Sequence, residues 1–516
     1  MAAKTPLHIA IAADLGWGHV RPLCALAARI VRLRDADVTL LTACRVHGLC
    51  VQELARNFED GEDALLARIR LVGLAQHETN MFDRSVVVAS FDAAIQRVLA
   101  GEPVPCAATK GEVPALRAPD ALIVDILGHE YFESARKHSS ALKTFVSMPP
   151  SLLAMHALST KVDDERLEEQ KAAVEKIMKE TGKTLGQATD QMMGGPSDEI
   201  VTIPGLPPMY NYEQYPQELV FDQGEMGQFY LTVPNLIRGC NGLFSASMAC
   251  IEPPEMIDLF TKFMATIGSE PLRLLGPLLP QTKREEEVER REIARSPEIS
   301  SFLKKVLEKH GERSMLYISF GTVFWSTQPE KVWTFLDVLL DKKIPFIMAH
   351  ASPFCQVPDE TMAKVKASGT GLFVPWAPQQ AILEHSATGW FVTHGGFNGI
   401  VESIHAGVPM ICWPFFGDQP MNVVHLTDNL DVAYELLEVR NGPWGLKPIY
   451  RTGVTPTGTL DAVRAEASTV LEKAFGKDGA RKRVNVQKLR DAALELWKEG
   501  GEARIATEQL LDSITA

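Results

Sequence analysis

The amino-terminal half contains a histidine and an aspartate whose positions suit acid–base chemistry. His19 lies in DLGWGHVRPL, where Gly16 and Gly18 permit a tight turn from an expected first strand into a helix. Asp125 ends the apolar run ALIVD, where a carboxylate is costly unless it has a partner. A histidine that acts as a general base needs such a carboxylate to hold its tautomer and stabilise the imidazolium. The sequence therefore predicts a catalytic pair, the alternatives being a structural histidine and an aspartate that caps the helix after Gly128.

The segment of residues 376–419, WAPQQAILEHSATGWFVTHGGFNGIVESIHAGVPMICWPFFGDQ, carries a second set of polar and aromatic residues. Trp376 follows an expected strand and offers a flat surface to a nucleobase, and the helix after THGG has free N–H groups that suit a phosphate. Asn398 and Glu402 are four residues apart and share one helical face, where a carboxylate can accept hydrogen bonds from ribose hydroxyls. Each residue alone also has a structural explanation, as a core aromatic, a turn, a cap or an ion-pair partner. Together they favour a nucleotide site.

Short apolar runs alternate with helical patterns through most of the chain, which predicts an α/β fold of two doubly wound domains facing each other across a cleft. The charge-dense stretch between LRLLGPLLP and SMLYISFG is the expected interdomain linker. The predicted strands are residues 7–13, 37–43, 70–74, 121–127 and 143–148, then 314–320, 345–349, 371–376, 389–394, 408–414 and 432–436. The predicted units are a first Rossmann-like domain (1–279), a linker (280–313), a second Rossmann-like domain (314–480) and carboxyl-terminal helices that pack back on the first domain (481–516).

Composition excludes several classes of protein. The 516 residues carry a formal net charge of −13, which disfavours nucleic acid as a partner because phosphate binding needs a clustered positive surface. The eight cysteines are scattered without a metal-binding or paired spacing, which indicates free thiols in a reducing compartment. No apolar run reaches the ~20 residues of a membrane span, and the amino terminus lacks the features of a signal peptide. A cytoplasmic location is therefore expected.

The segment 376–419 resembles the donor-binding signature of the UDP-dependent family 1 glycosyltransferases and has the length of its plant form. The resemblance implies a GT-B fold, with an acceptor-binding domain at 1–279 and a nucleotide-sugar-binding domain at 314–480, and a role for each matching position. Trp376 would stack on uracil with Gln379 near the uridine, His394, Gly396 and Asn398 would meet the diphosphate, Glu402 would hold the ribose, and Asp418 and Gln419 would bind sugar hydroxyls. The final glutamine is more similar to glucose users than to galactose users. Phe397 and Gly399 depart from the usual Trp and Ser, and Gly399 leaves one phosphate contact to a backbone N–H.

Four positions in the amino-terminal half match the same family. Its GHxxP-like segment, whose histidine is the general base, corresponds to His19 and Pro22, and its catalytic aspartate corresponds to Asp125. Ser147 matches, by its spacing from Asp125, a hydroxyl residue that contacts the donor sugar. The chemistry of two other residues, in the motif SFGT, also suits a phosphate, independently of the resemblance. Gly321 allows the backbone to approach a ligand closely, and the Thr322 hydroxyl can donate to a phosphate oxygen.

These observations predict an inverting, metal-independent transfer of a sugar, expected to be glucose, from a UDP-sugar to a hydroxyl of a small lipophilic acceptor. UDP-glucose is then a co-substrate, and no cofactor, metal or nucleic acid is expected. Asp35 and Asp37 form a literal DxD, but two carboxylates alone do not cage a divalent ion. The alternatives are a nicotinamide-dependent oxidoreductase, which the missing third glycine of GxGxxG disfavours, and a non-catalytic sugar-nucleotide-binding protein.

The acceptor is the least determined part of the prediction. The insertion of residues 155–230 is expected to supply either an apolar acceptor pocket or ordinary packing. Its candidate lining residues are Met192, Met193, Met209, Tyr210, Tyr212 and Tyr215. A monomer is expected.

Overall fold

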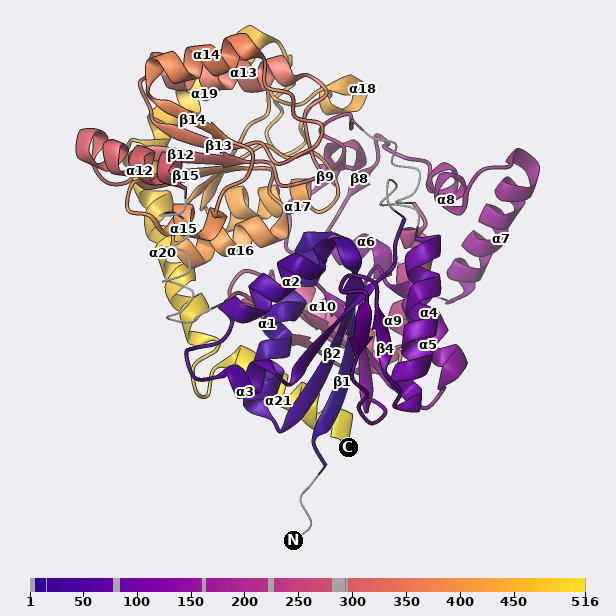
Figure 1. Cartoon of the computed structure of the whole chain (residues 1–516). Coiled ribbons are helices and arrows are strands. Elements are labelled where there is room, and N and C mark those ends of the chain that lie inside the picture. Colours follow the sequence, from indigo (N-terminus) through magenta and orange to yellow (C-terminus); the bar gives the residue numbers. More distant parts are fainter. Residues whose placement is uncertain are drawn as a thin grey trace.

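The computed structural model describes residues 5–14, 16–77, 84–159, 164–220, 227–280, 293 and 296–515. Two parallel β-sheets with helices on both faces form two domains, with the amino-terminal half below and the carboxyl-terminal half above in Figure 1. This architecture confirms the predicted α/β class with two doubly wound units. All eight cysteines are free, as the scattered spacing predicts.

The amino-terminal sheet has seven strands in the order β11-β10-β7-β6-β1-β2-β3, and all its pairings are parallel. Its central strands are almost wholly buried because helices cover both faces, which explains why they appear in the sequence as continuous apolar runs. The strands are β1 Leu7–Ala12, β2 Ala36–Ala43, β3 Ile69–Leu74, β6 Ala121–Asp125, β7 Lys143–Met148, β10 Gly242–Ser245 and β11 Glu270–Leu274. The helices are α1 Trp17–Leu33, α2 Cys44–Arg56, α3 Asp63–Leu66, α4 Ser85–Ala100, α5 His129–His138, α6 Leu152–Ser159, α7 Asp164–Thr181, α8 Leu185–Met193, α9 Phe229–Gly239 and α10 Pro254–Thr266.

The carboxyl-terminal sheet has six parallel strands in the order β14-β13-β12-β15-β16-β17. Successive residues of the central strand β12 point into two hydrophobic cores, one on each face of the sheet. Tyr317 packs with residues of α12, α16 and α20 (Lys477–Glu495), whereas Leu316 and Ile318 pack with residues of α13 and α19. The strands are β12 Met315–Ser319, β13 Phe346–Ala349, β14 Gly371–Val374, β15 Thr388–Thr393, β16 Met410–Cys412 and β17 Ala433–Glu435. The helices are α12 Pro297–His310, α13 Pro329–Asp341, α14 Asp359–Ser368, α15 Gln379–Glu384, α16 Phe397–Ala406, α17 Gln419–Val424, α18 Gly442–Gly445 and α19 Leu460–Ala474.

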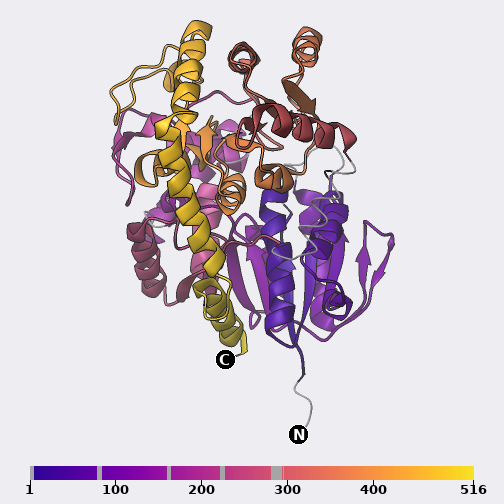
Figure 2. The same ribbon diagram turned by 90° about the vertical axis from the view of Figure 1, so that its left-hand side faces the viewer.

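The last two helices run from the second domain to the first, as Figure 2 shows in yellow. Helix α20 (Lys477–Glu495) packs on α16, and α21 (Glu502–Thr515) packs on α1 and β11. Leu510, Leu511 and Ile514 of α21 enter the core of the amino-terminal domain, and Lys143 donates to the carbonyls of two residues in the last turn of α21, at 3.1 and 3.2 Å.

The segment between the two sheets, which the sequence analysis assigned to a linker, contains the helix α12. Within the predicted linker 280–313, residues 281–292 and 294–295 lie outside the described residues. Helix α12 follows them, and its buried face, Ile299, Phe302, Leu303 and Val306, belongs to the core of the second domain. The inserted segment forms α7 and α8, which extend sideways from the first domain in Figure 1, and the short pair β8 (Ile200–Val201) and β9 (Met209–Tyr210).

Candidate active site between the two sheets

Each sheet reverses its strand order at one point, and the predicted site residues follow the strands at these two points. In the first sheet the reversal lies between β1 and β6, so that the turn leading to His19 and the end of β6 at Asp125 are neighbours. In the second it lies between β12 and β15, which lead to Gly321 and His394. Ligands of open α/β sheets bind at such points, outside the carboxyl ends of the strands.

The structure brings His19 and Asp125 together. Nδ1 of His19 lies 3.1 and 3.0 Å from the two carboxylate oxygens of Asp125, which also accepts a 2.9 Å hydrogen bond from the backbone N–H of Leu127. The Asp125 side chain is 3% exposed and that of His19 is 26% exposed. Burial lowers the pKa of His19, but the carboxylates of Asp125, Asp418 and Asp14 together outweigh it, with Asp125 contributing most, so that the pKa is raised above its usual value. The pair can therefore hold Nδ1 protonated and leave Nε2 as the basic atom.

Two residues near this pair were predicted to touch the donor sugar. Ser147 of β7 is the residue paired with Asp125 of β6 on the adjacent strand. It is fully buried, and its Oγ has no hydrogen-bond partner within the described part of the chain. Asp418 lies at the start of α17, where Asn422 donates to its Oδ2 at 2.8 Å. Burial raises the pKa of Asp418 to about 6, although nearby His19 acts to lower it. This charge coupling places a carboxylate of the second domain close to the His19 imidazole of the first.

Two glycines enclose the ring of His394. Gly321 has φ +74°, a left-handed conformation, and a Cβ added there would lie 3.2 Å from the His394 ring; at Gly396 it would lie 2.4 Å from Nε2. Burial lowers the pKa of His394 to about 4, so this side chain is neutral at pH 7. Its Nδ1 is buried without a partner among the described residues. His394 can therefore act as a neutral hydrogen-bonding group beside the amino terminus of α16.

The face of α16 predicted to bind the nucleotide contacts the first domain. The Asn398 amide donates to the carbonyl of Gly18 at 2.8 Å. One oxygen of Glu402 accepts from Arg21, and the other accepts from Gln379 at 2.5 Å. Glu402 is 4% exposed, which makes it a buried carboxylate with cation and amide partners. Gln379 and Glu402, which the sequence assigned to the uridine and the ribose, are thus direct neighbours.

The remaining predicted donor residues differ in accessibility. Trp376 is 61% exposed and follows β14, so its ring face is available for stacking. Thr322 is exposed, and a Cβ at Gly399 would meet Phe391 and Thr393 at ordinary contact distances, so a serine would fit there. Gln419 is 2% exposed, and its Oε1 already accepts from the backbone N–H groups of the two preceding phenylalanines at 2.8 and 3.3 Å. Only its amide NH₂ end could reach a sugar.

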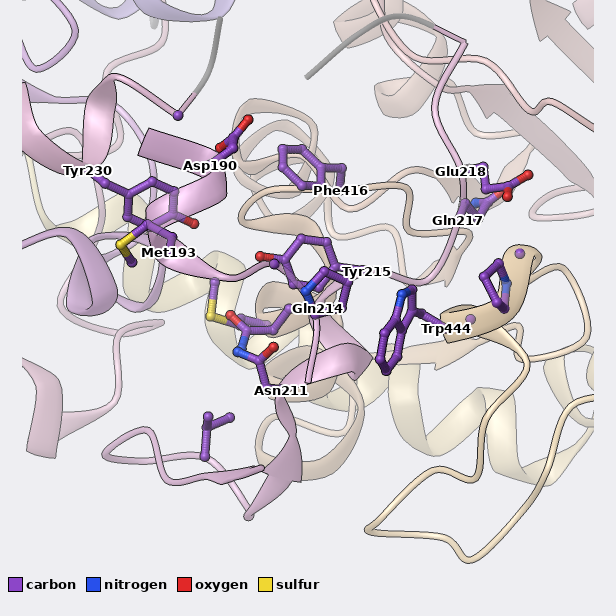
Figure 3. Close-up of a pocket in the computed structure, with 18 of the residues that line it drawn as sticks. Asp190, Met193, Asn211, Gln214, Tyr215, Gln217, Glu218, Tyr230, Phe416 and Trp444 are labelled. Carbon is purple, nitrogen blue, oxygen red and sulfur yellow. The ribbon is translucent and has the colours of Figure 1, made fainter. Parts of the chain in front are cut away.

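A cavity of about 430 Å³ lies between the insertion and the second domain (Figure 3). Four aromatic side chains from both halves line it: Tyr215, Tyr230, Phe416 and Trp444. Of the residues expected to form an acceptor pocket, Met193 and Tyr215 line it, whereas Tyr210, Tyr212, Met209 and Met192 do not. Instead Tyr210 and Tyr212 stack on each other with ring centroids 4.9 Å apart, Met209 is buried in the first domain, and Met192 packs against α7 and α9 residues.

The literal DxD is part of an ion-pair cluster. Arg68 contacts Asp35 at 2.5 Å and Asp37 at 3.2 Å, so these carboxylates are paired with a guanidinium and need no metal ion to explain them. Across the described ranges, no group of three or more His, Cys, Asp or Glu side chains could hold a metal ion. Within the same ranges, no helix is long and apolar enough to cross a membrane.

Sequence reasoning missed the residues that join the two halves of the site. Arg21 stands where a GxGxxG fingerprint would have its third glycine and was given no role, yet it donates to Glu402 and Gln380 in the other domain. Asn422 was not considered, although Ser151 of the first domain donates to its Oδ1 at 2.6 Å. A charged residue one turn inside α1, the helix that carries His19, is the one signal that pointed to Arg21.

Comparison with known proteins identifies the family from the sequence and shows that solved structures share the fold. Residues 285–436 match the family model described as UDP-glucoronosyl and UDP-glucosyl transferase. A UDP-glycosyltransferase of Hericium erinaceus, eriJ, is 31% identical over 98% of both chains. Phytolacca americana UGT2, solved with UDP-2fluoro-glucose and pterostilbene, covers 99% of this chain and 100% of its own with a TM-score of 0.66 at 20% identity. Medicago truncatula UGT71G1, solved with UDP-glucose, covers 99% of both chains with a TM-score of 0.67 at 17% identity.

Proposed function

This chain belongs to the UDP-dependent glycosyltransferase family and transfers a sugar from a UDP-sugar to an acceptor, and on that premise we propose an inverting transfer of glucose from UDP-glucose to a hydroxyl of a small lipophilic molecule. Membership decides against the nicotinamide-dependent alternative. The observation that carries the proposal is the His19–Asp125 pair at 3.0 Å, which lies opposite the donor-binding loops of the second, GT-B-type domain.

His19 is the proposed general base. Its Nε2 takes the proton from the acceptor hydroxyl as that oxygen attacks the anomeric carbon from the face opposite UDP, and the bond to the UDP oxygen breaks. The configuration at the anomeric carbon is thereby inverted, through an oxocarbenium-like transition state. Asp125, 3.0 Å from Nδ1, stabilises the imidazolium that forms.

The second domain is the proposed donor site. The exposed ring of Trp376 stacks on uracil. Glu402 accepts hydrogen bonds from the ribose hydroxyls, and the neighbouring Gln379 amide donates to the ribose. The amino terminus of α16 and the neutral His394 donate to the diphosphate as negative charge builds on the leaving group. Both relatives solved with a glucose nucleotide support glucose as the sugar, together with the closing Asp418–Gln419 pair.

The cavity lined by Tyr215, Tyr230, Phe416 and Trp444 is the proposed acceptor pocket. Its volume of about 430 Å³ suits a small molecule, and aromatic walls favour a flat or apolar one. Phe416 is two residues before Asp418, so the cavity is adjacent to the sugar-binding end of the donor loop. The acid side chains among its lining residues, Asp190 and Glu218, favour neutral acceptors over carboxylates.

A product-mass screen tests the proposal. The enzyme is incubated with UDP-glucose, UDP-galactose or UDP-glucuronate and a panel of phenols, terpenoid alcohols, sterols and hydroxy fatty acids. We expect hexosylated products from UDP-glucose, with inverted anomeric configuration by NMR, and almost none with His19→Ala. Products of retained configuration, or full activity of His19→Ala, would contradict the proposed mechanism.

A further inference from the structure

The polar groups that the proposed donor site offers from α16 are engaged by residues of α1. The Gly18 carbonyl accepts from the amide of Asn398 at 2.8 Å, and Arg21 donates to Glu402. Asn398 and Glu402 are one helical turn apart, so one short stretch of α1 covers the face of α16 that would meet a diphosphate and a ribose. The domain contact and the donor use the same hydrogen-bonding groups.

Arg21 is the centre of this contact. Within its own domain its Nε donates to Glu53 at 2.8 Å, and across the interface its two Nη atoms donate to Glu402 and Gln380. The side chain of Arg21 is only 12% exposed, and those of Glu53 and Glu402 are 3% and 4% exposed. Arg21 and Gln379 therefore hold one oxygen each of a Glu402 carboxylate that is almost closed to solvent.

We propose that Arg21 sets the donor affinity by competing with the ribose for Glu402. This inference rests on the donor site proposed above. Gln379 donates to one oxygen of Glu402 and Arg21 donates to the other. The ribose hydroxyls can therefore hydrogen-bond to Glu402 only when the guanidinium moves away. The donor then binds only the fraction of molecules in which the Arg21 contact is broken, and its apparent dissociation constant rises in inverse proportion to that fraction.

The opposite role for Arg21 gives the opposite sign. Each carboxylate oxygen can accept more than one hydrogen bond, so an Arg21 that stayed in place would orient Glu402 toward the ribose. Its removal would then weaken donor binding, and would also leave a buried carboxylate without its cation. The low exposure of Glu402 favours competition, because a positioned carboxylate that was ready for ribose would be open on one side.

Calorimetric titration of the full-length enzyme with UDP separates the two roles. Arg21→Met keeps the aliphatic stem and removes the donors, and we expect UDP to bind roughly three- to tenfold more tightly. The matched control is Arg32→Met on the same helix, whose ion pair with Glu62 lies outside the site and whose loss should leave UDP affinity unchanged. Unchanged or weaker UDP binding by Arg21→Met overturns the inference.

Two further variants keep the test decisive. Arg21→Lys retains the charge but has no planar fork to reach Glu53, Glu402 and Gln380 together, so we expect an intermediate UDP affinity even where Arg21→Met folds poorly. Glu402→Ala should weaken UDP binding. If it leaves UDP binding unchanged, the donor site itself is misassigned, whereas a weakened Glu402→Ala beside an unimproved Arg21→Met refutes the competition alone. In turnover, the competition predicts a lower KM for the UDP-sugar in Arg21→Met at an unchanged acceptor KM.

Discussion

A double-mutant cycle on His19 and Asp125 tests whether the two residues act as one base. Nδ1 of His19 contacts both oxygens of Asp125. Removing the imidazole therefore removes the proton acceptor, and it also leaves Asp125 without the cation that it would stabilise. General base catalysis is worth roughly 10²–10⁴ in rate, which is about 3–5 kcal/mol of activation free energy. We expect His19→Ala to lower kcat by that factor while UDP affinity stays unchanged.

Asp125→Asn keeps the shape of the carboxylate but loses the charge that stabilises the imidazolium. Because Asp125 works through His19, the double variant His19→Ala/Asp125→Asn should be no slower than His19→Ala alone. UDP release at saturating donor and acceptor measures kcat, and calorimetry with UDP checks that each variant folds and binds nucleotide. Independent, multiplying effects of the two substitutions would refute the paired mechanism, as would near wild-type turnover of His19→Ala.

Three other predictions follow from the same geometry. Protonated His19 accepts no proton, so kcat should fall as the pH drops through its raised pKa, and in Asp125→Asn this acid limb should move to lower pH because only the weaker influence of Asp418 and Asp14 then opposes the effect of burial; a limb that stays in place would show that another group titrates. Trp376→Ala should weaken UDP binding by about 1–3 kcal/mol, the range for loss of base stacking, with the acceptor KM unchanged; an unaltered UDP affinity would place uracil elsewhere. Trp444→Ala should raise the acceptor KM roughly tenfold for the loss of apolar contact, with the donor KM unchanged, and a donor defect instead would disprove the pocket assignment.

The strands that could be predicted are those whose burial leaves a mark on composition. The strands at the centres of both sheets are apolar on both faces, and the prediction for 143–148 matches β7 to the residue. Two strands of the seven-stranded sheet were missed: β10 is the short run GLFS, and β11, EPLRL, lies at the partly exposed edge of the sheet with a charged residue inside it. In β10 only Leu243 and Phe244 are large and apolar, between a glycine and a serine, and an edge strand such as β11 lacks the double burial that makes a strand recognisable.

For the candidate site, the sequence could predict where its residues lie along the chain but not which residues they contact. Residues at strand ends, such as His19, Asp125 and His394, follow from the link between sheet topology and ligand position. The partners follow from tertiary packing: Gln419, expected to bind sugar through its amide, has its oxygen held by the backbone of its own loop, and Arg21 reaches Glu402, which is 381 residues away in the chain. No local pattern encodes such a contact.

The insertion gives the two domains a second connection, on the side of the proposed acceptor pocket. Asn441 accepts from the backbone N–H of Glu218 at 2.7 Å, and the hydroxyl of Tyr212 donates to the carbonyl of Pro448 at 2.6 Å. These hydrogen bonds hold the loop of the first domain on the second independently of Arg21. Releasing Arg21 should therefore loosen the donor side while the walls of the pocket stay together.

This arrangement makes a final prediction about selectivity. If the acceptor pocket keeps its shape when the Arg21 contact is lost, Arg21→Met should change the KM of the UDP-sugar but keep the rank order of acceptors. Tyr212→Phe, which removes only the hydrogen bond to Pro448, should do the reverse. Comparing kcat/KM across one acceptor panel for both variants and the wild type measures this directly. A reordered panel in Arg21→Met would mean that donor and acceptor sites move as one body, because the same contact would then control both.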